Sequence, residues 1–261
     1  MPPRSDQPRD RNVPRRNSAR EARSASSRPK AFWWLLGIIA LVGVAALAYV
    51  ASKPKAGPRE ALQGPDTTNA GPPQGYEIGS ASAPVQILEF ADFECPSCAG
   101  YATITEPDVR QRIVNAGLAR FTYLDFPLTQ HRNSLAASNA AACADEQGKF
   151  WPMHDRLFNA QDEWNGEATD VPKPFFRRYA SEIGLDVAKW EACFDGRKYQ
   201  KRISANLAEG LRRGVNSTPT FVIGTKLYPG NRSYDQMKAL VDSIARTSGA
   251  TGTAASSTTP K

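Results

Sequence analysis

The chain has 261 residues, a formal net charge of +7, and hydrophobic residues at 41% of its positions. Residues 1–31 hold nine Lys or Arg and three acidic residues, so this segment accounts for six of the seven net positive charges. The remainder is close to neutral, which excludes a basic domain built to bind nucleic acid.

Residues 1–30 are predicted to form a disordered, basic cytoplasmic tail, because they are rich in Pro and Ser and nearly free of large apolar residues. Residues 31–51 carry no charge, and as a helix they would measure about 32 Å, enough to cross the hydrocarbon core. The positive-inside rule then predicts a single-pass cell-membrane protein whose folded domain is extracytoplasmic, in the periplasm or at the outer surface. The alternative is a cleaved signal peptide, with Ala46-Leu47-Ala48 as a small-x-small site.

Three further segments follow this apolar stretch. Residues 52–75 are rich in Pro and Gly and are expected to form a linker that spans about 27 Å as a loose coil. Residues 76–246 contain all the patterned apolar segments and are predicted to be one folded domain. Residues 247–261 are small and polar, and we expect a disordered tail there.

Within the domain, hydrophobic periodicity predicts helices and strands in a definite order. The predicted strands cover residues 85–90, 118–124, 220–223 and 226–228. The first predicted helix covers residues 99–115 and has a break near Pro107. A long helical stretch is predicted at residues 134–213, and a last helix at residues 234–246. The order predicts an α/β domain with one mixed sheet and a large helical insertion at about residues 130–213.

Cys95-Pro96-Ser97-Cys98 follows the first predicted strand and begins a helix. Partial positive charge and free N–H groups at a helix N-terminus stabilise a thiolate, and Pro96 fits the first turn. We expect Cys95 to be exposed and nucleophilic, and Cys98 to be more buried and to resolve the mixed disulfide. The pattern therefore predicts a redox-active dithiol.

The same residues allow two alternatives to a redox dithiol. Structural zinc needs further ligands, yet the chain has no second CxxC, and His131 and His154 lack zinc-ligand spacing. A local structural disulfide is the other alternative. We expect neither a metal nor a cofactor. Asp92 and Glu94 are expected to be solvated loop acids that oppose thiolate formation at Cys95.

Three segments resemble DsbA-like oxidoreductases of the thioredoxin fold. They are Ile87–Cys98 (ILEFADFECPSC), Gly148-Lys149-Phe150-Trp151 and Val215–Phe221 (VNSTPTF). The resemblance covers about residues 76–246 and implies a thioredoxin fold with a helical insertion. It departs from the family pattern between the cysteines, where Pro-Ser replaces Pro-His, and this leaves the strength of oxidation open.

The resemblance also implies roles for residues outside the motif. Thr218-Pro219 matches the position of a cis-proline, where Thr218 would face Cys95 and bind an extended client; the alternative is an ordinary trans proline. Glu89 matches a buried acid that passes protons to or from Cys98; the alternative is an edge position in water.

Cys143 and Cys193 lie 50 residues apart in the predicted insertion. They are interpreted either as inert buried thiols or as a structural disulfide between two helices. An even cysteine count and an oxidising compartment favour the bridge, and some DsbA-like proteins carry such a bridge in the insertion.

The predicted function is disulfide exchange on exported proteins that carry thiols or disulfides. We expect a monomer that introduces disulfides and is recharged by a membrane or extracytoplasmic redox partner. The alternatives are a disulfide reductase or isomerase, a module that binds copper(I) through the CxxC, and a membrane-anchored chaperone or scaffold without catalysis. No separate dimerisation domain is visible in the sequence, which favours an oxidase over an isomerase.

Overall fold

A computed structural model describes residues 30–52, 67–68 and 70–254. The chain divides into two units, residues 1–57 and 58–261. In the first unit, Lys30–Ser52 form one helix, α1. Over the residues whose burial the structure describes, which in α1 are 32–48, no helix combines the length and the apolarity that a membrane crossing requires. The predicted tail up to residue 29, most of the predicted linker and residues 255–261 lie outside the described residues.

The second unit contains a five-stranded mixed sheet with the order β1-β3-β2-β4-β5. Its strands are β1 (Tyr76–Ile78), β2 (Val85–Ala91), β3 (Ala119–Asp125), β4 (Thr220–Ile223) and β5 (Lys226–Pro229). Strands β2 and β3 are parallel, and the other neighbours are antiparallel. The central strand β2 is rich in apolar and branched side chains, which is typical of a strand covered on both faces.

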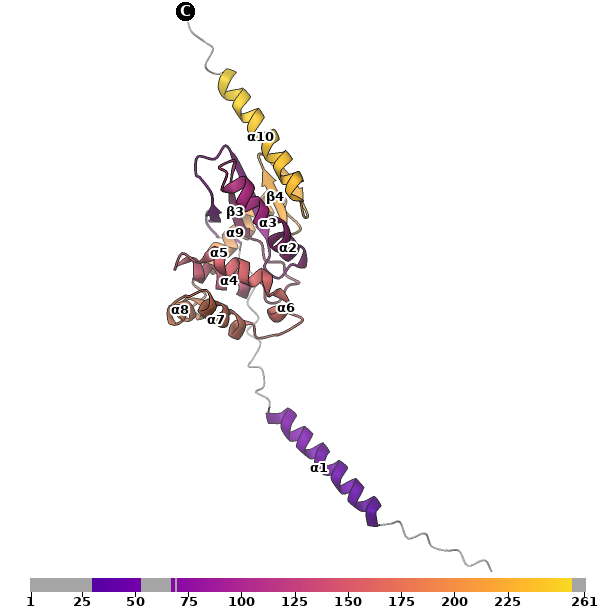
Figure 1. Ribbon diagram of the computed structural model, residues 1–261. Helices are drawn as coiled ribbons and strands as arrows, with labels where there is room; N and C mark the ends of the chain where they lie inside the picture. Colours follow the sequence, from indigo (N-terminus) through magenta and orange to yellow (C-terminus); the bar gives the residue numbers. More distant parts are fainter. Residues whose placement is uncertain (1–29, 53–66, 69, 255–261) are drawn as a thin grey trace, which may run out of the picture. The chain divides into compact units, whose positions relative to one another are not determined.

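The helices of this unit fall into three groups. A continuous helical segment after β2 consists of α2 (Pro96–Gly100), the π-helical turn η1 (Tyr101–Thr105), α3 (Glu106–Val109) and a second π-helical turn, η2 (Arg110–Val114). The insertion holds α4 (Ser134–Asp145), α5 (Phe150–Asn159), α6 (Gln161–Trp164), α7 (Lys173–Glu182), α8 (Val187–Asp195) and α9 (Gln200–Arg213). The last helix is α10 (Tyr234–Ala254), and α4 to α8 gather on one side of the domain (Figure 1).

The side chains of β2 alternate between two apolar layers. Val85 and Ile87 pack with buried residues of α3, η2 and α10, whereas Phe90 packs on the other face with Phe126 and Val215. A third cluster fills the helical insertion and contains both redox cysteines. The active-site motif therefore lies where the sheet meets the insertion.

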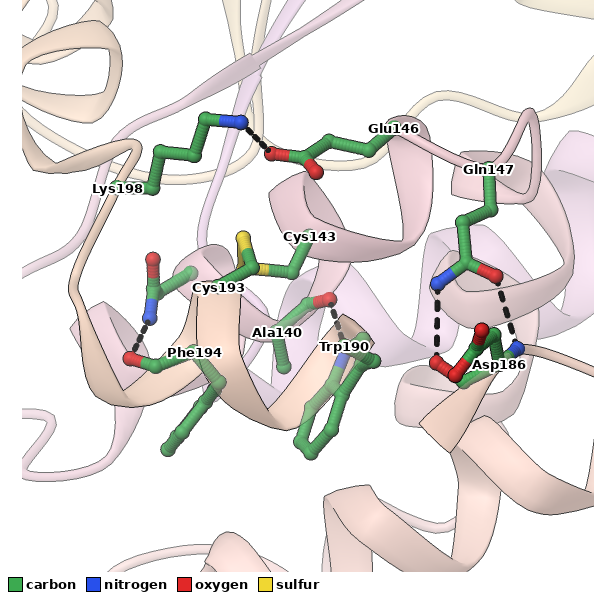
Figure 2. The surroundings of a disulfide bond; sticks show 10 residues. Ala140, Cys143, Glu146, Gln147, Asp186, Trp190, Cys193, Phe194 and Lys198 are labelled. Atoms are coloured by element: carbon green, nitrogen blue, oxygen red, sulfur yellow. Dashed lines mark hydrogen bonds and ion pairs between the residues drawn. A yellow bond between two sulfur atoms is a disulfide. The ribbon is translucent and has the colours of Figure 1, made fainter. Parts of the chain in front are cut away.

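A disulfide joins Cys143 of α4 to Cys193 of α8, the bridge favoured from the sequence. Figure 2 shows the contacts around it: the Trp190 indole donates to the carbonyl oxygen of Ala140 at 3.0 Å. Two further hydrogen bonds link Gln147 and Asp186 across the same pair of helices. These contacts fasten α8 onto α4 beside the bridge.

The observed elements differ from the predicted ones at several places. Strand β1 was not predicted, because three residues are too few to show a periodicity. The predicted single helical stretch is divided, and Gly148 and Gly184 have positive φ values at two of its breaks, a conformation suited to glycine. Helix α10 continues eight residues beyond Arg246, into the segment predicted as a tail.

The expected break near Pro107 is wrong, because the chain stays helical from Pro96 to Val114. Pro107 stands in the first turn of α3, between the two π-helical turns. The π-helical turns on either side depart from the regular i→i−4 hydrogen bonds, so the missing N–H of Pro107 is accommodated without ending the helix.

Candidate active site

The two cysteines of the dithiol lie between the end of strand β2 and the first turn of helix α2. Cys95 is the N-cap residue of α2, with extended backbone angles, and Pro96 is the first helical residue. Both cysteines are free thiols. Cys98 is fully buried and Cys95 is 7% exposed, while Pro96 and Ser97 face solvent. Cys95 is therefore less exposed than expected, because the cis-proline loop and the insertion cover it. It is still the more accessible of the two thiols.

The two thiols have opposite electrostatic properties. A hydrogen bond from the Cys98 thiol, together with the backbone N–H groups of Ser97 and Cys98, outweighs burial and lowers the pKa of Cys95 to about 5. Burial raises the pKa of Cys98, and its hydrogen bond to Cys95 raises it further. At neutral pH the reduced pair therefore consists of a Cys95 thiolate and a Cys98 thiol, which is the arrangement of a nucleophile and a resolving group.

The loop before β4 closes over the dithiol. The peptide bond between Thr218 and Pro219 is cis. The Cys95 sulfur lies 3.5 Å from the carbonyl oxygen of Thr218 and donates to it when protonated. The Pro219 carbonyl accepts from Gly230 N at 2.8 Å, which joins this loop to the segment after β5. Thr218 and Pro219 therefore adjoin the reactive sulfur.

Glu89 occupies the buried position that the resemblance implied, and the alternative of an edge position in water is wrong. It is 2% exposed and lies in β2 between Tyr123 of β3 and Phe221 of β4. Burial raises its pKa well above the usual range, and the charge of Glu106 raises it further. The charge of Glu89 contributes in turn to the raised pKa of Cys98. A carboxyl group whose pKa is raised is suited to exchange a proton with a thiolate.

The expectation that Asp92 is a solvated acid is wrong. Asp92 is fully buried, and its carboxylate accepts hydrogen bonds from the backbone N–H groups of Glu94 and Leu128 at 2.8 Å each. It also accepts from the Ser134 hydroxyl at 2.5 Å, and it pairs with Nδ1 of His131 at 2.7 Å. This hydrogen bond raises the pKa of His131. Four partners satisfy the charge, so Asp92 fixes the segment before Cys95 onto the start of α4.

Glu94 is buried as well, contrary to expectation. Its two carboxylate oxygens accept from the backbone N–H groups of Asn133 at 2.5 Å and Gly166 at 2.6 Å. On the same side, the amide of Gln161 donates to the carbonyl oxygens of Phe93 at 2.7 Å and Cys95 at 3.1 Å. The insertion thus holds the active-site loop through polar contacts from three separate segments.

Sequence reasoning also missed the buried carboxylate of Glu106 in α3, which is 1% exposed. Arg110 pairs with it one helical turn later, with Nε 2.7 Å from Oε1. The other oxygen, Oε2, lies 3.7 Å from Nε2 of the fully buried His154. The i, i+4 spacing of Glu106 and Arg110 was a readable signal, but it is also the spacing of an ordinary surface pair.

Comparison with known proteins identifies the family. A thioredoxin family model matches residues 72–243. The chain belongs to this thioredoxin family. The solved structure of α-DsbA1 from Wolbachia pipientis matches with a TM-score of 0.61 at 18% identity, covering 69% of this chain and 94% of that one. The similarity shows that the domain has the same fold as that structure, and at the N-terminus of α2 it carries two free cysteines in a CxxC motif.

Two curated relatives illustrate where such domains occur. A probable disulfide bond formation protein D from Bacillus cereus is 22% identical over 170 residues, which are 63% of this chain and 76% of that protein. A Na⁺/H⁺ antiporter, NhaA 3 of Salinispora tropica, is 34% identical over 171 residues, or 65% of this chain. The match spans only 24% of that antiporter, so the transport activity in its name describes a much longer protein.

Proposed function

We propose that this protein introduces disulfides into exported proteins through Cys95 and Cys98. The supporting observation is the contrast between the two thiols, with the pKa of Cys95 lowered to about 5 and that of Cys98 raised. A stabilised Cys95 thiolate favours the reduced pair, and this makes the corresponding disulfide easier to reduce and a better oxidant.

The exchange follows from the geometry. A client thiolate attacks the Cys95 sulfur of the oxidised pair, and Cys98 leaves with the electron pair and takes up a proton. A second client thiolate then attacks the client sulfur of the mixed disulfide and releases Cys95 as a thiolate. Thr218 and Pro219 adjoin the attacked sulfur, where an extended client segment is held in line. A redox partner in the membrane or outside the cytoplasm removes the electrons and restores the disulfide.

We further propose that residues 31–51 anchor the protein in the cell membrane as a single span. The support is the sequence, in which an uncharged apolar segment follows a strongly basic one. Residues 1–30 would then be cytoplasmic and the thioredoxin domain extracytoplasmic, acting as a monomer. A reporter fused after Lys261 should be active only outside the cytoplasm, and the mature chain should keep its N-terminus. A mature protein that begins near Tyr49 would instead indicate a cleaved signal peptide.

The reduction potential of the Cys95–Cys98 pair tests the direction of exchange. Equilibration with glutathione should give a value more positive than about −200 mV for a disulfide donor, and one below about −250 mV would indicate a reductase. In cells, Cys98→Ala should accumulate mixed disulfides through Cys95, and Cys95→Ala should not. If Cys98→Ala traps no partner and the purified protein instead binds copper(I) through both thiols, the metal-binding alternative is preferred.

A further inference from the structure

Five buried polar atoms on neighbouring elements of the domain have no hydrogen-bond partner among the described residues. They are Oε2 of Glu89, Oε2 of Glu106, Nε2 of His154 and the hydroxyl groups of Tyr101 and Tyr123. Each of these residues is at most 2% exposed. Leaving a buried polar group unpaired is unfavourable, so five such groups together point to internal water molecules that bridge them.

These groups are neighbours although they come from different elements. Glu89 and Tyr123 are paired across β2 and β3, and the Tyr123 ring lies 5.3 Å from the His154 ring. Oε2 of Glu106 lies 3.7 Å from Nε2 of His154. The charges of both Glu89 and Glu106 raise the pKa of Tyr101, after the larger effect of burial. The cluster therefore extends from β2 and β3 to α3 and α5.

His154 has a partner for either of its neutral tautomers. With the proton on Nδ1, it donates to Oδ1 of Asp155 at 2.8 Å, and Nε2 is free to accept from the direction of Glu106. With the proton on Nε2, it faces Oε2 of Glu106, and Nδ1 accepts from Arg110 at 3.1 Å. A histidine with a partner at each ring nitrogen can take up a proton at one nitrogen and release one from the other without moving.

Both ends of the cluster are placed for proton transfer. At the inner end, Glu89 lies opposite Tyr123, which packs in the same buried cluster as Cys98, and the charge of Glu89 adds to the raised pKa of that thiol. At the outer end, the side chain of Asp155 is 50% exposed. Arg110 occupies only Oε1 of Glu106, so Oε2 is left to face His154.

We propose that Glu106, His154 and Asp155 form a proton relay that connects Glu89, and through it Cys98, to solvent at the surface of α5. The relay rests on the proposed function. When a client thiolate displaces Cys98 from the disulfide, the electron pair stays on the Cys98 sulfur and Glu89 supplies its proton. Solvent beside Asp155 supplies a proton to His154, His154 passes one to the Glu106 carboxylate, and Glu106 passes it to Glu89, with internal water spanning the gaps. Reoxidation by the redox partner's disulfide sends one proton back the same way.

The test measures how fast reduced glutathione reduces the oxidised full-length protein in detergent, in H₂O and in D₂O. Glu106→Gln and Asp155→Asn keep the shapes of their side chains but remove the titrating group. Both should slow the reaction by roughly tenfold to a hundredfold and increase the solvent isotope effect. Asp155→Glu should restore the rate. Asp108→Asn, an exposed carboxylate of the same helix as Glu106, is the matched control and should stay within about twofold.

Two further measurements separate a relay from a structural role. The thermal midpoint and the pH at which the Cys95 thiolate forms should be unchanged in Asp155→Asn, because Asp155 lies at the surface end of the relay. Rates of Glu106→Gln and Asp155→Asn equal to the wild-type rate, with equal isotope effects, would overturn the relay and leave the proposed function standing. A wild-type protein that does not exchange with glutathione at all would overturn the proposed function itself.

Discussion

The sulfur of Cys95 lies 3.5 Å from the carbonyl oxygen of Thr218, although 123 residues separate the two in the sequence. Strand β4 runs antiparallel to β2, and this pairing brings the end of the Thr218 loop beside the N-terminus of α2. One side of the reactive sulfur is thereby formed by backbone rather than by a side chain. This contact places the backbone edge at which the proposed client segment would bind directly beside Cys95.

The lowered pKa of Cys95 should depend on Cys98. The hydrogen bond from the Cys98 thiol is the largest influence on it, so Cys98→Ala should raise the pKa of Cys95 from about 5 by one unit or more. Absorbance of the thiolate against pH in the reduced protein measures this. Ser97→Ala is the control, because Ser97 acts through its backbone N–H, and its pKa curve should match that of the wild type. An unchanged curve for Cys98→Ala would contradict the assignment.

Asp125 should make the folded protein less stable as the pH rises. Burial raises its pKa to about 6 from an ordinary 3.8, so the folded state holds a proton that the unfolded state has already lost. The contribution of Asp125 to the free energy of unfolding is therefore largest below about pH 4, and it falls by about 2–3 kcal/mol as the pH rises to about 6. Asp125→Asn should remove this decline, since the amide oxygen can still accept from Asn206. Urea unfolding at pH 4 and pH 7 measures it; equal declines in both proteins would exclude Asp125 as the cause.

The disulfide between Cys143 and Cys193 should contribute to stability and not to exchange. It closes a loop of 50 residues, so replacing both cysteines with Ala should lower the free energy of unfolding by about 2–4 kcal/mol. The reduction potential of the Cys95–Cys98 pair should be unchanged, as measured against glutathione. A shifted potential would mean that the bridge takes part in the redox chemistry.

Glu94 should hold the active-site loop against the insertion. Glu94→Gln replaces one of two buried carboxylate oxygens with an NH₂ group, which cannot accept from Asn133 N or Gly166 N. We expect a loss of about 1–3 kcal/mol in unfolding free energy and faster amide hydrogen exchange at these positions. Glu167→Gln, a change at an exposed neighbour, should have little effect. Equal exchange rates in the two variants would argue against this role.

The sequence was sufficient for the features that depend on local pattern. Strand β4 was predicted with its observed ends, and β2 within one residue of its observed end, because apolar periodicity reports burial directly. The redox motif was equally clear, since two cysteines at this spacing after a strand define a helix N-terminus and a dithiol. The family resemblance added the roles of Glu89, Thr218 and Pro219, none of which a local pattern identifies.

Only the tertiary structure decided which charged residues are buried and what they contact. Asp92 and Glu94 stand in a loop that local sequence makes polar, and they are buried because α4 and the segment at Gly166 supply donors to them. Glu106 and His154 lie 48 positions apart in the chain, and the packing of α5 against the helical segment after β2 brings them together. A carboxylate is buried away from water only when hydrogen-bond donors from other segments take the place of its water molecules. Which segments supply these donors depends on long-range packing, which no short stretch of sequence encodes.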